Sequence, residues 1–368
     1  MSAARTRPLA VVAMSGGVDS SVAAALMQDA GYDVIGIMLK LWDGVGLNGA
    51  ANNESGCCSL DAAEDARRVA QVLDIPFYVF NFAEAFARSV VDDFVAAAAA
   101  GRTPNPCITC NRSIKFSALL ARARTFGAAV LATGHYARVA GGAGGRQLLR
   151  ARDRSKDQSY VLYMLDQAEL ESARFPVGEY AKAEVREIAA SLGLRTAAKP
   201  ESQEICFVPG GDVHAFLREA VPEGSQPGPI LTAAGERIGT HRGFAHYTVG
   251  QRRGLGVGVG LPLYVREVRA ADNALVVGPA GGATVRCLEL SGVSLVAGGG
   301  AGSGGAEVRG AAMTRYRGPE APGTLVTDGA GAGTFLFDEP QPPPAPGQAA
   351  VVYDGELVMG GGTIERSG

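Results

Sequence analysis

The sequence lacks any apolar run long enough to cross a bilayer, any internal repeat, and any large excess of one charge. Its 34 Lys and Arg against 37 Asp and Glu give a net charge of −3, which argues against indiscriminate nucleic-acid binding. A local basic patch is still compatible with this balance. Arg5 and Arg7 precede an apolar run that breaks at a Gly-Gly turn without a cleavage signature, so we expect no signal peptide, no membrane association and a cytoplasmic protein.

The sequence is also poor in cysteine. Six cysteines among 368 residues are too few for a fold held together by disulfides. In a reducing compartment, paired cysteines indicate metal or redox chemistry instead. The length allows two or three domains, and the hydrophobic content of 47% is that of a globular protein. The glycines are densest from about Gly254 onward, which predicts loops and turns in the C-terminal part.

The stretch Val11–Ser21 is the most informative part of the chain. It reads as a buried strand, a tight S-G-G-V-D-S-S turn, and a helix from near Val18 to Gly31. Gly16 and Gly17 allow a sharp turn and a close approach to a ligand. The helix N-terminus offers N–H groups and a partial positive charge, so an anion fits there.

This turn lacks the Lys of a Walker A loop. It resembles the PP-loop of the N-type ATP pyrophosphatases, which cleave ATP to AMP and pyrophosphate while adenylating a carbonyl oxygen. An ordinary strand-to-helix turn is the simpler alternative. Asp19 is a candidate ligand for Mg²⁺ against the phosphates, and equally a helix-start residue.

The pattern predicts an α/β fold with a parallel-sheet PP-loop domain over residues 1–208, a small β-rich central domain over 209–282, and a C-terminal β-barrel over 283–368. Ligands of such sheets bind at the carboxyl ends of the strands. We expect strands at Tyr32–Leu41, Pro76–Phe82 and Val130–Thr133, helices at Phe86–Ala100, Ser113–Phe126, from Asp157 and at Lys182–Leu192, a hairpin over Gly141–Arg152, and short strands after Cys206.

Three cysteines carry candidate chemistry. Cys107 and Cys110 stand three apart behind two prolines, and we place Cys110 just before a helix N-terminus, which favours a thiolate. Cys206 is far away in the sequence, so only the fold can bring it to Cys110. Cys107 and Cys110 could be half of a zinc site, all three thiols could hold an iron–sulfur cluster, or two of them could be a sulfur-transfer pair. Cys57, Cys58 and Cys287 are expected to be structural.

Taken together, the motifs resemble the bacterial tRNA-specific 2-thiouridylases over nearly the whole chain, from Ala13 to Gln348. They are S-G-G-V-D-S-S, T-P-N-P-C-I-T-C-N-R-S-I-K-F, A-T-G-H-Y-A-R, K-D-Q-S-Y-V-L-Y, E-S-Q-E-I-C-F, Y-T-V-G-Q-R-R-G-L-G, T-R-Y-R and P-G-Q-A. Such enzymes replace the C2 oxygen of the tRNA wobble uridine by sulfur. Some members carry Asp where this chain has Cys107, so a [4Fe-4S] cluster held by Cys107, Cys110 and Cys206 stays an alternative.

The resemblance implies a role for individual residues. ATP would be bound by Ala13, Met14, Ser15, Gly16, Gly17, Val18, Asp19, Ser20, Leu39 and Gly134. The target base would be contacted by Asn105, Pro106 and Cys107, and the tRNA by His135, Lys156, Asp157, Gln158, Arg315, Tyr316 and Gln348. Cys110 would be the nucleophile and Cys206 the persulfide carrier.

The implied chemistry is coherent. Adenylation turns the C2 oxygen into a leaving AMP, and a Cys206 persulfide supplies sulfur, leaving a Cys110–Cys206 disulfide. The expected partners are tRNA and a sulfur donor, either a cysteine desulfurase or a relay protein. The base would flip into a pocket, and the Asp43–Gly56 loop is a candidate lid. Two rival functions are an ATP pyrophosphatase acting on a small molecule and a non-catalytic RNA-binding protein.

Overall fold

A five-stranded parallel sheet forms the centre of the N-terminal domain in this computed structural model, which describes residues 7–42, 60–142, 144–201, 205–258, 260–281, 283–296 and 305–368. Its strand order is β3-β2-β1-β4-β7. The strands are β1 (Leu9–Ala13), β2 (Asp33–Lys40), β3 (Phe77–Asn81), β4 (Val130–Thr133) and β7 (Ala173–Arg174). The chain order reverses between β1 and β4, which is where a ligand of such a sheet binds.

Side chains of the central strands alternate between two hydrophobic cores. Leu9 and Val11 of β1 face one core, whereas Ala10 and Val12 face the other. The second core is covered by α1 (Val18–Asp29), α2 (Leu60–Val72) and α8 (Lys182–Ser191). Because both faces are covered, the strands read as nearly continuous apolar runs, as expected for a parallel sheet.

Two long helices cover the first core. One joins α3 (Ala83–Phe86), a π-helical stretch (Ala87–Val91) and α4 (Asp92–Ala99). The other joins α5 (Pro106–Cys110), a second π-helical stretch (Asn111–Leu119) and α6 (Leu120–Thr125), and α7 (Gln167–Ser172) follows later. This core continues into α9 (Val213–Ala220) and the barrel through Phe216, Val351 and Tyr353.

Two helix predictions in this region were wrong in detail. The stretch from Asp157 forms only a short 3₁₀ turn, Ser159–Val161, where we expected a helix to start. The stretch after Cys206 contains α9 (Val213–Ala220), which was not expected, and Asp212 caps it by accepting a hydrogen bond from the N–H of Ala215. Further 3₁₀ turns lie at Pro176–Glu179, Arg195–Ala198, Pro209–Gly211, Glu223–Ser225 and Phe244–His246.

The C-terminal strands close into a six-stranded barrel, because β12 pairs with both β15 and β17. They are β12 (Val285–Leu295), β13 (Ala306–Met313), β14 (Glu320–Thr327), β15 (Ala332–Gln341), β16 (Ala349–Asp354) and β17 (Leu357–Ser367). The expected Asp354-Gly355 hairpin turn joins β16 to β17. The middle domain is a four-stranded sheet of β10 (Leu263–Arg269), β11 (Ala274–Pro279), β8 (Gly228–Thr232) and β9 (Arg237–His241), in that order. The predicted fold class is therefore confirmed.

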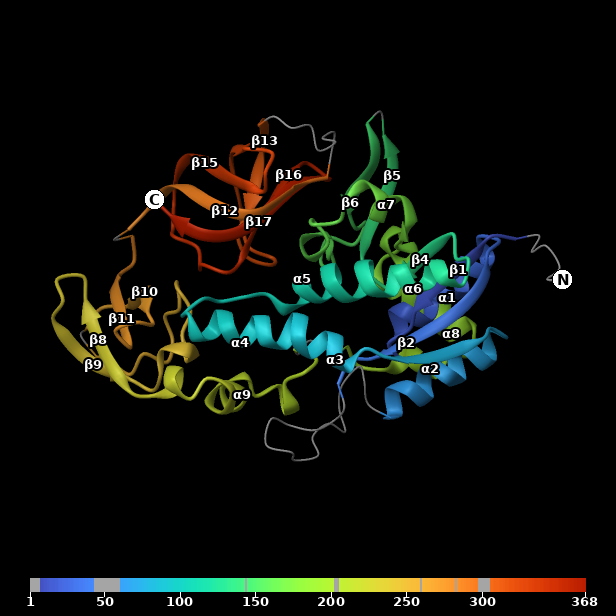
Figure 1. The fold of residues 1–368 in the computed structure, drawn as a ribbon, viewed down its shortest axis with the longest axis horizontal. Helices are drawn as coiled ribbons and strands as arrows, with labels where there is room; N and C mark the ends of the chain where they lie inside the picture. Colours follow the sequence, from blue (N-terminus) through green and yellow to red (C-terminus); the bar gives the residue numbers. More distant parts are fainter. Residues whose placement is uncertain are drawn as a thin grey trace.

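The expected hairpin after β4 has a further role. Its strands, β5 (Ala137–Gly142) and β6 (Gly145–Arg150), extend the barrel sheet through the pairing of Leu149 with Leu357. The N-terminal domain thus contributes two strands to the C-terminal sheet. In Figure 1 the barrel stands above α5, and the middle domain lies at the far end of α4.

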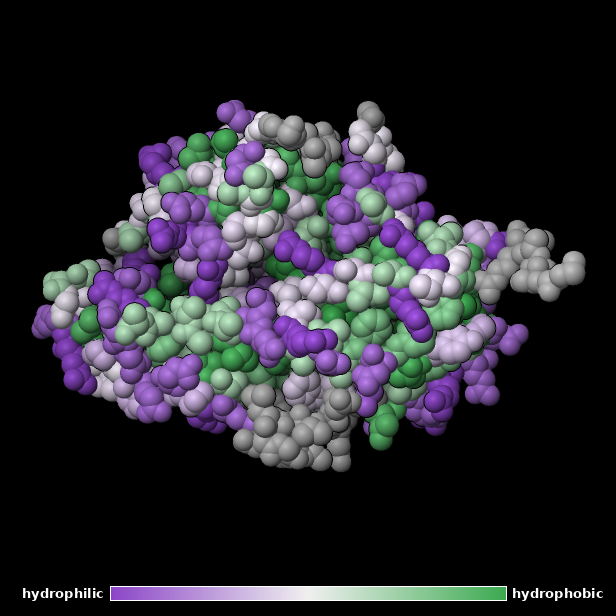
Figure 2. Space-filling view, viewed as in Figure 1, coloured by the Kyte–Doolittle hydropathy of each residue, from purple (hydrophilic) through white to green (hydrophobic). Residues whose placement is uncertain are grey.

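Hydrophilic residues are spread over all three domains on the face shown in Figure 2. Among the described residues, no helix combines the length and apolar character needed to cross a membrane.

Arg150, at the end of β6, connects the β5–β6 hairpin to the barrel. Its side chain is 7% exposed, pairs with Glu320 at 2.5 Å, and lies over the ring of Tyr353 at 3.5 Å. We predict that Arg150→Ala destabilises the protein by about 2 kcal/mol, less than a fully buried pair costs because Glu320 is partly exposed. The midpoint of thermal unfolding measures this. Arg154→Ala is the control, since Arg154 is 50% exposed and should cost about 0.5 kcal/mol or less. Equal midpoints for the two variants would contradict the prediction.

Candidate functional site

The turn after β1 is fixed by its own hydroxyl groups. The Ser15 N–H donates to Ser20 Oγ at 3.1 Å, and Ser20 Oγ and Ser21 Oγ donate to the carbonyl of Gly17 at 3.1 and 2.8 Å. Gly16 has φ +70°, and a Cβ there would collide with the backbone of Ala62 in α2. The loop therefore needs glycine at this position and packs against α2 through its backbone.

The helix that follows starts without a side-chain cap. Gly17 is the N-cap residue, in extended conformation, and no described side chain accepts a hydrogen bond from the first turn of α1 in its place. Gly134, directly after β4, presses against this turn, because a Cβ there would lie 2.6 Å from the N of Ser20. An uncapped and immobilised helix start is suited to binding an anion. Leu39, the other predicted adenosine contact, is buried near the carboxyl end of β2.

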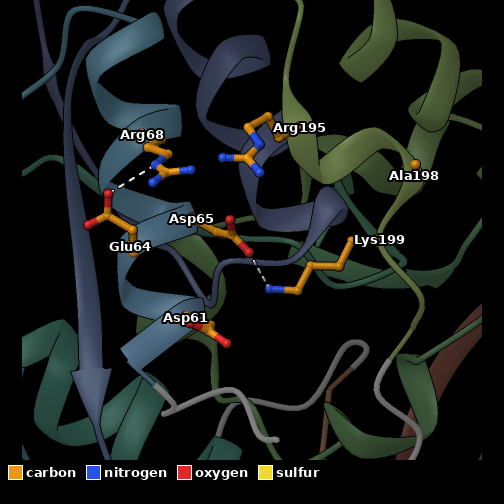
Figure 3. Close-up of a pocket in the computed structure, with 7 residues that line it drawn as sticks. All are labelled: Asp61, Glu64, Asp65, Arg68, Arg195, Ala198 and Lys199. Carbon is orange, nitrogen blue, oxygen red and sulfur yellow. Dashed lines mark hydrogen bonds and ion pairs between the residues drawn. The ribbon is translucent and has the colours of Figure 1, made fainter. Parts of the chain in front are cut away.

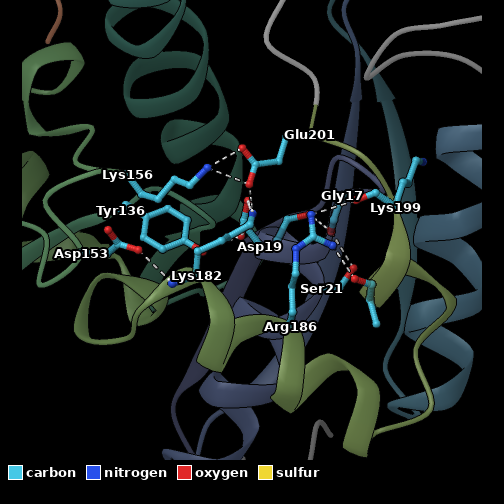
Figure 4. A network of polar contacts seen from close by, with 12 residues as sticks. Gly17, Asp19, Ser21, Tyr136, Asp153, Lys156, Lys182, Arg186, Lys199 and Glu201 are labelled. Atoms are coloured by element: carbon cyan, nitrogen blue, oxygen red, sulfur yellow. Dashed lines mark hydrogen bonds and ion pairs between the residues drawn. The ribbon is translucent and has the colours of Figure 1, made fainter.

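A chain of charged groups lies beside the loop (Figure 4). Lys182 Nζ contacts both carboxylate oxygens of Asp19, at 2.7 and 2.8 Å, and Oε1 of Glu201 at 3.0 Å. Lys156 Nζ donates to both oxygens of Glu201, at 3.0 and 2.8 Å. The hydroxyl of Tyr136 donates to Asp19 at 2.8 Å. Asp19 thus lies at the loop as expected, with its carboxylate shared by a lysine and a tyrosine.

Neighbouring charges and burial shift the pKa values of Glu201 and Tyr136 in this chain of charged groups. The hydrogen bond from Lys156, with further help from Lys182, lowers the pKa of Glu201 to about 2. Burial, with the nearby Asp19 carboxylate, raises the pKa of Tyr136 well above its usual value, so the phenol stays protonated as a donor. At neutral pH two carboxylates and two ammonium groups therefore balance each other.

Lys182 and Glu201 were not predicted as site residues from the sequence. Lys182 is the first residue of α8, where the helix dipole disfavours a positive charge, and this position was the available signal. Its side chain is only 11% exposed, because it turns back to the loop.

A charged cavity of about 510 Å³ lies on the α2 side of the loop (Figure 3). Its lining residues are Asp61, Glu64, Asp65, Arg68, Arg195, Ala198 and Lys199. Lys199 Nζ donates to Asp65 at 2.7 Å and to the carbonyl of Gly16 at 3.0 Å. Because the lining combines both signs of charge, with Arg68 paired to Glu64 and Lys199 to Asp65, we assign no ligand to it.

Cys107 and Cys110 lie at the start of a helix, with one correction. Pro106 is the first residue of α5, Asn105 caps it by accepting a hydrogen bond from the Cys107 N–H at 3.1 Å, and Cys110 lies one turn inside. The prediction that Cys110 precedes a helix N-terminus, and that Pro106 is outside the helix, was wrong. A proline is tolerated at the first helical position, since its missing N–H would be unpaired there anyway. Cys107 is exposed and Cys110 is buried.

The loop before these cysteines lies where all three domains meet. The Thr103 N–H donates to the carbonyl of Pro346 at 2.8 Å, and Gln348 Nε2 donates to the carbonyl of Thr103 at 2.7 Å, so both contacts reach the barrel. Thr103 Oγ1 also bonds the hydroxyl of Thr248 in the middle domain at 3.2 Å. The predicted site residue Gln348 is thus brought to the cysteine loop.

Cys206 and Cys110 belong to segments fixed on the same helix. Phe207 packs its ring edge-on against Phe86 and Phe94, with centroids 5.8 and 5.5 Å apart. Thr109 donates to Asp93 on that helix at 3.3 Å. Cys206 is half-buried against the same hydrophobic core that contains Cys110. Both segments therefore pack against the helix that runs from Ala83 to Ala99, and the approach of Cys206 to Cys110 stays a prediction.

The three thiols do not form a metal site in the described part of the chain, because no group there of three or more His, Cys, Asp or Glu side chains could hold a metal ion. The ligand set expected for an iron–sulfur cluster, Cys107, Cys110 and Cys206, is therefore not gathered into one group here. Cys57, Cys58 and the candidate lid Asp43–Gly56 lie outside the described residues.

Several predicted tRNA contacts face inward. Asp157 is 8% exposed and accepts from the Ala151 N–H at 2.9 Å, and Gln158 Oε1 accepts from the Tyr136 N–H at 3.0 Å. His135 is 9% exposed, bonds Thr133 at 2.7 Å, and has its pKa lowered well below the usual value by burial and by Lys115.

Arg315 and Tyr316 face outward instead. Tyr316 is 38% exposed, its hydroxyl donates to the carbonyl of Asp157 at 3.1 Å, and the Arg317 guanidinium lies 5.1 Å from its ring. Burial of the hydroxyl raises the pKa of Tyr316, with smaller contributions from Asp157 and Cys107. An exposed pair of Tyr316 and Arg317 is therefore bonded to the main chain of Asp157.

Comparison with known proteins identifies relatives of the whole chain. Residues 9–210 match the tRNA methyl transferase HUP domain, 214–279 the tRNA methyl transferase PRC-barrel domain, and 300–364 the aminomethyltransferase beta-barrel domain. The tRNA-specific 2-thiouridylase MnmA of Moorella thermoacetica is 50% identical, covering 96% of this chain and 99% of its own length. The protein of the same name from a Roseiflexus species is 48% identical, covering 97% and 99%.

Likeness to solved structures is weaker. A 4-thiouridine synthetase in complex with RNA and ATP overlaps with 59% of this chain and 51% of its own, at 17% identity and a TM-score of 0.36. This overlap is too low to argue from.

Gly134→Ala tests the immobilised helix start. A Cβ 2.6 Å from Ser20 N and 2.8 Å from the carbonyl carbon of Asp19 must displace the first turn of α1, which we expect to cost about 1–3 kcal/mol. Thermal unfolding measures the loss. Gly141→Ala is the matched control, since a Cβ at Gly141 meets nothing within 4 Å. Unchanged stability of the Gly134 variant would show that the turn is not fixed by this contact.

Glu201→Gln tests the ion-pair chain through its pH dependence. The folded pKa of about 2 lies below the ordinary 4.5, so the ionised carboxylate stabilises the fold above pH 4.5 and this contribution is lost as the pH falls towards 2. The variant should therefore be less stable than the parent at neutral pH, and the gap should narrow below about pH 4.5. Paired unfolding curves across this range measure it; a gap independent of pH would contradict the assignment.

Proposed function

Because this chain belongs to the tRNA-specific 2-thiouridylase family, we propose that it replaces the C2 oxygen of the wobble uridine of tRNA by sulfur, with ATP as the activating substrate and a cysteine persulfide as the sulfur source. The chain is a tRNA sulfurtransferase. The proposed reaction has two parts, activation of the uracil carbonyl by ATP and delivery of sulfur to C2, and each part needs its own set of side chains.

The turn after β1 is the proposed ATP site. A uracil carbonyl oxygen is a poor leaving group, and transfer of AMP to it, with release of pyrophosphate, makes it a good one. Ala13–Ser20 would receive the phosphates at the uncapped start of α1, and Leu39 and Gly134 would line the adenosine. Mg²⁺ would accompany the phosphates and neutralise part of their charge. Asp19 is the loop carboxylate placed to hold it, after exchange of its Lys182 contact.

Sulfur transfer is assigned to Cys110 and Cys206. In one order, the Cys110 thiolate attacks the Cys206 sulfur of the persulfide, expelling hydrosulfide, which attacks C2 and displaces AMP. In the other, the terminal persulfide sulfur attacks C2 and displaces AMP, and Cys110 then breaks the S–S bond. Both orders leave thiouridine and a Cys110–Cys206 disulfide, so a reductant and a sulfur donor protein, a cysteine desulfurase or a relay protein, must restore the enzyme.

The single observation that carries this proposal is the position of the cysteine loop. It lies at the meeting point of three domains, with Gln348 of the barrel and Thr248 of the middle domain both bonded to Thr103. A base that leaves its stack can be received there by Asn105, Pro106 and Cys107 while aromatic and cationic groups contact the strand. A site for a small molecule needs no such surface from a separate barrel.

The proposed tRNA residues fall into two groups. Arg315, Tyr316 and Gln348 would contact the tRNA directly, since Arg315 and Tyr316 are exposed and Gln348 is half-exposed. Asp157, Gln158 and His135 have inward-facing side chains, so we assign them to holding that surface in place. The main-chain carbonyl oxygen of Asp157 accepts a hydrogen bond from the Tyr316 hydroxyl.

The experiment compares wild type, Cys110→Ser and Cys206→Ser with ATP, a persulfide donor and a tRNA transcript carrying a wobble uridine. Wild type should release pyrophosphate only with this tRNA and should form 2-thiouridine, detected by mass spectrometry of digested tRNA. Each serine variant should lose thiolation by at least about 100-fold while still binding ATP, since a hydroxyl cannot replace the thiolate.

Cys287→Ser is the control, because Cys287 is in β12 of the barrel and is expected to keep full activity. Thiolation retained by either site variant would overturn the sulfur-transfer assignment. Pyrophosphate release without tRNA would favour the small-molecule alternative, and tRNA binding without pyrophosphate release would favour a non-catalytic RNA-binding protein.

A further inference from the structure

The segment Lys199–Glu201 is linked to the turn after β1, the proposed phosphate site, at two places. Lys199 donates to the carbonyl of Gly16 at 3.0 Å, and Glu201 reaches Lys182, which in turn holds Asp19. Figure 4 shows Lys199 on one side of the loop and Glu201 on the other. Cys206 follows Glu201 by five residues in the sequence.

Glu201 takes a position that suits a phosphate. Its two oxygens are held by two ammonium groups, from Lys156 at 3.0 and 2.8 Å and from Lys182 at 3.0 Å. The side chains of Lys156 and Lys182 are 26% and 11% exposed, so both charges are partly removed from water. Two converging lysines beside an uncapped helix start would bind any small polyanion, and a carboxylate is the weaker ligand of that class.

We propose that Lys156 and Lys182 form a phosphate subsite, that Glu201 occupies it in the nucleotide-free chain, and that the phosphates of ATP displace Glu201 when they bind. This inference rests on the proposed function, since it takes ATP as the ligand of the loop. Lys182 is bound to Asp19, the loop residue at the start of α1, so the subsite is continuous with the proposed phosphate site. Lys156 thereby acquires a role at the nucleotide in addition to the tRNA contact that the resemblance implies.

Displacement couples the nucleotide to the sulfur carrier. Glu201 and ATP cannot hold the same lysines together, so ATP binding detaches Glu201, which precedes Cys206 by five residues in the sequence. By linkage, Glu201 weakens ATP binding by the same factor as ATP weakens the hold on Glu201, so removing the Glu201 carboxylate while keeping both lysines strengthens ATP binding. The persulfide carrier would then be released when the activating substrate is in place.

The experiment measures ATP affinity and the alkylation rate of Cys206 in the full chain, with a non-hydrolysable ATP analogue as probe and site-resolved mass spectrometry as readout. For wild type, saturating analogue should raise the alkylation rate of Cys206 by about three-fold or more. Glu201→Gln should bind the analogue about 3- to 10-fold more tightly, as expected for losing a partly exposed competing carboxylate. In this variant, Cys206 should be alkylated at the rate of analogue-saturated wild type, whether or not the analogue is present.

Lys156→Gln is the second variant and separates the proposal from simple destabilisation. It should also speed alkylation of Cys206, but it should weaken analogue binding, because it removes a phosphate ligand. Glu187→Gln is the matched control, since Glu187 is exposed on α8 and should behave as wild type. A general loss of folding would weaken binding in both site variants and would overturn the proposal.

The remaining outcomes are also decisive. If wild type binds the analogue and the Cys206 rate does not change, the displacement is wrong while the proposed function stands. If tRNA alone accelerates Cys206 and the analogue does not, the subsite serves a tRNA phosphate and the assignment to ATP is wrong. If wild type does not bind the analogue at all, the proposed ATP-dependent function itself fails.

Discussion

The close approach of the end of β4 to the start of α1 is the constraint on which the site depends. Gly134 leaves no room for a Cβ against the backbone of Asp19 and Ser20, so the first turn of α1 is held in one place. Two residues later Tyr136 donates its hydroxyl to Asp19. Because β4 pairs directly with β1, the strand order itself brings this contact to the carboxyl edge of the sheet. The position of Asp19 then determines where Lys182, and through it Glu201, can lie.

The sequence was sufficient wherever the signal was local. Alternation of Leu9, Ala10, Val11 and Val12 between two cores, together with the glycine turn, marks a strand buried on both faces before a helix. The pairing of the β5–β6 hairpin with β17 could not be predicted, because Leu149 and Leu357 are 208 positions apart and neither strand carries a mark of its partner. Cys110 was misplaced because Pro106, taken as a helix breaker, in fact begins the helix. The ion pairs of Lys182 with Asp19 and of Glu201 with Lys156 could not be predicted either, because each joins residues far apart in the sequence.

The net charge of the chain does not reveal the ion pairs beside the turn after β1. Asp19, Lys182, Glu201 and Lys156 sum to zero, as a net charge of −3 over the whole chain allows. A neutral chain of ions in a partly buried position costs little to maintain, yet each ammonium group keeps its affinity for a stronger anion. A substrate carrying several negative charges can therefore enter by exchange with the carboxylates that the lysines already hold.

The three cysteines differ in exposure in an order that fits their assigned chemistry. A persulfide or hydrosulfide must be kept from water and from other thiols until the base is activated, so the reacting sulfur belongs in the interior. Cys110 is buried, Cys206 is half-buried and Cys107 is exposed. Cys107 nevertheless stands in the first turn of α5, where the helix dipole favours a thiolate, whereas Cys110 lies a full turn further in. Since the dipole falls off within one turn, it favours the outer thiol, and the nucleophilic role that we propose for Cys110 must therefore rest on its other surroundings.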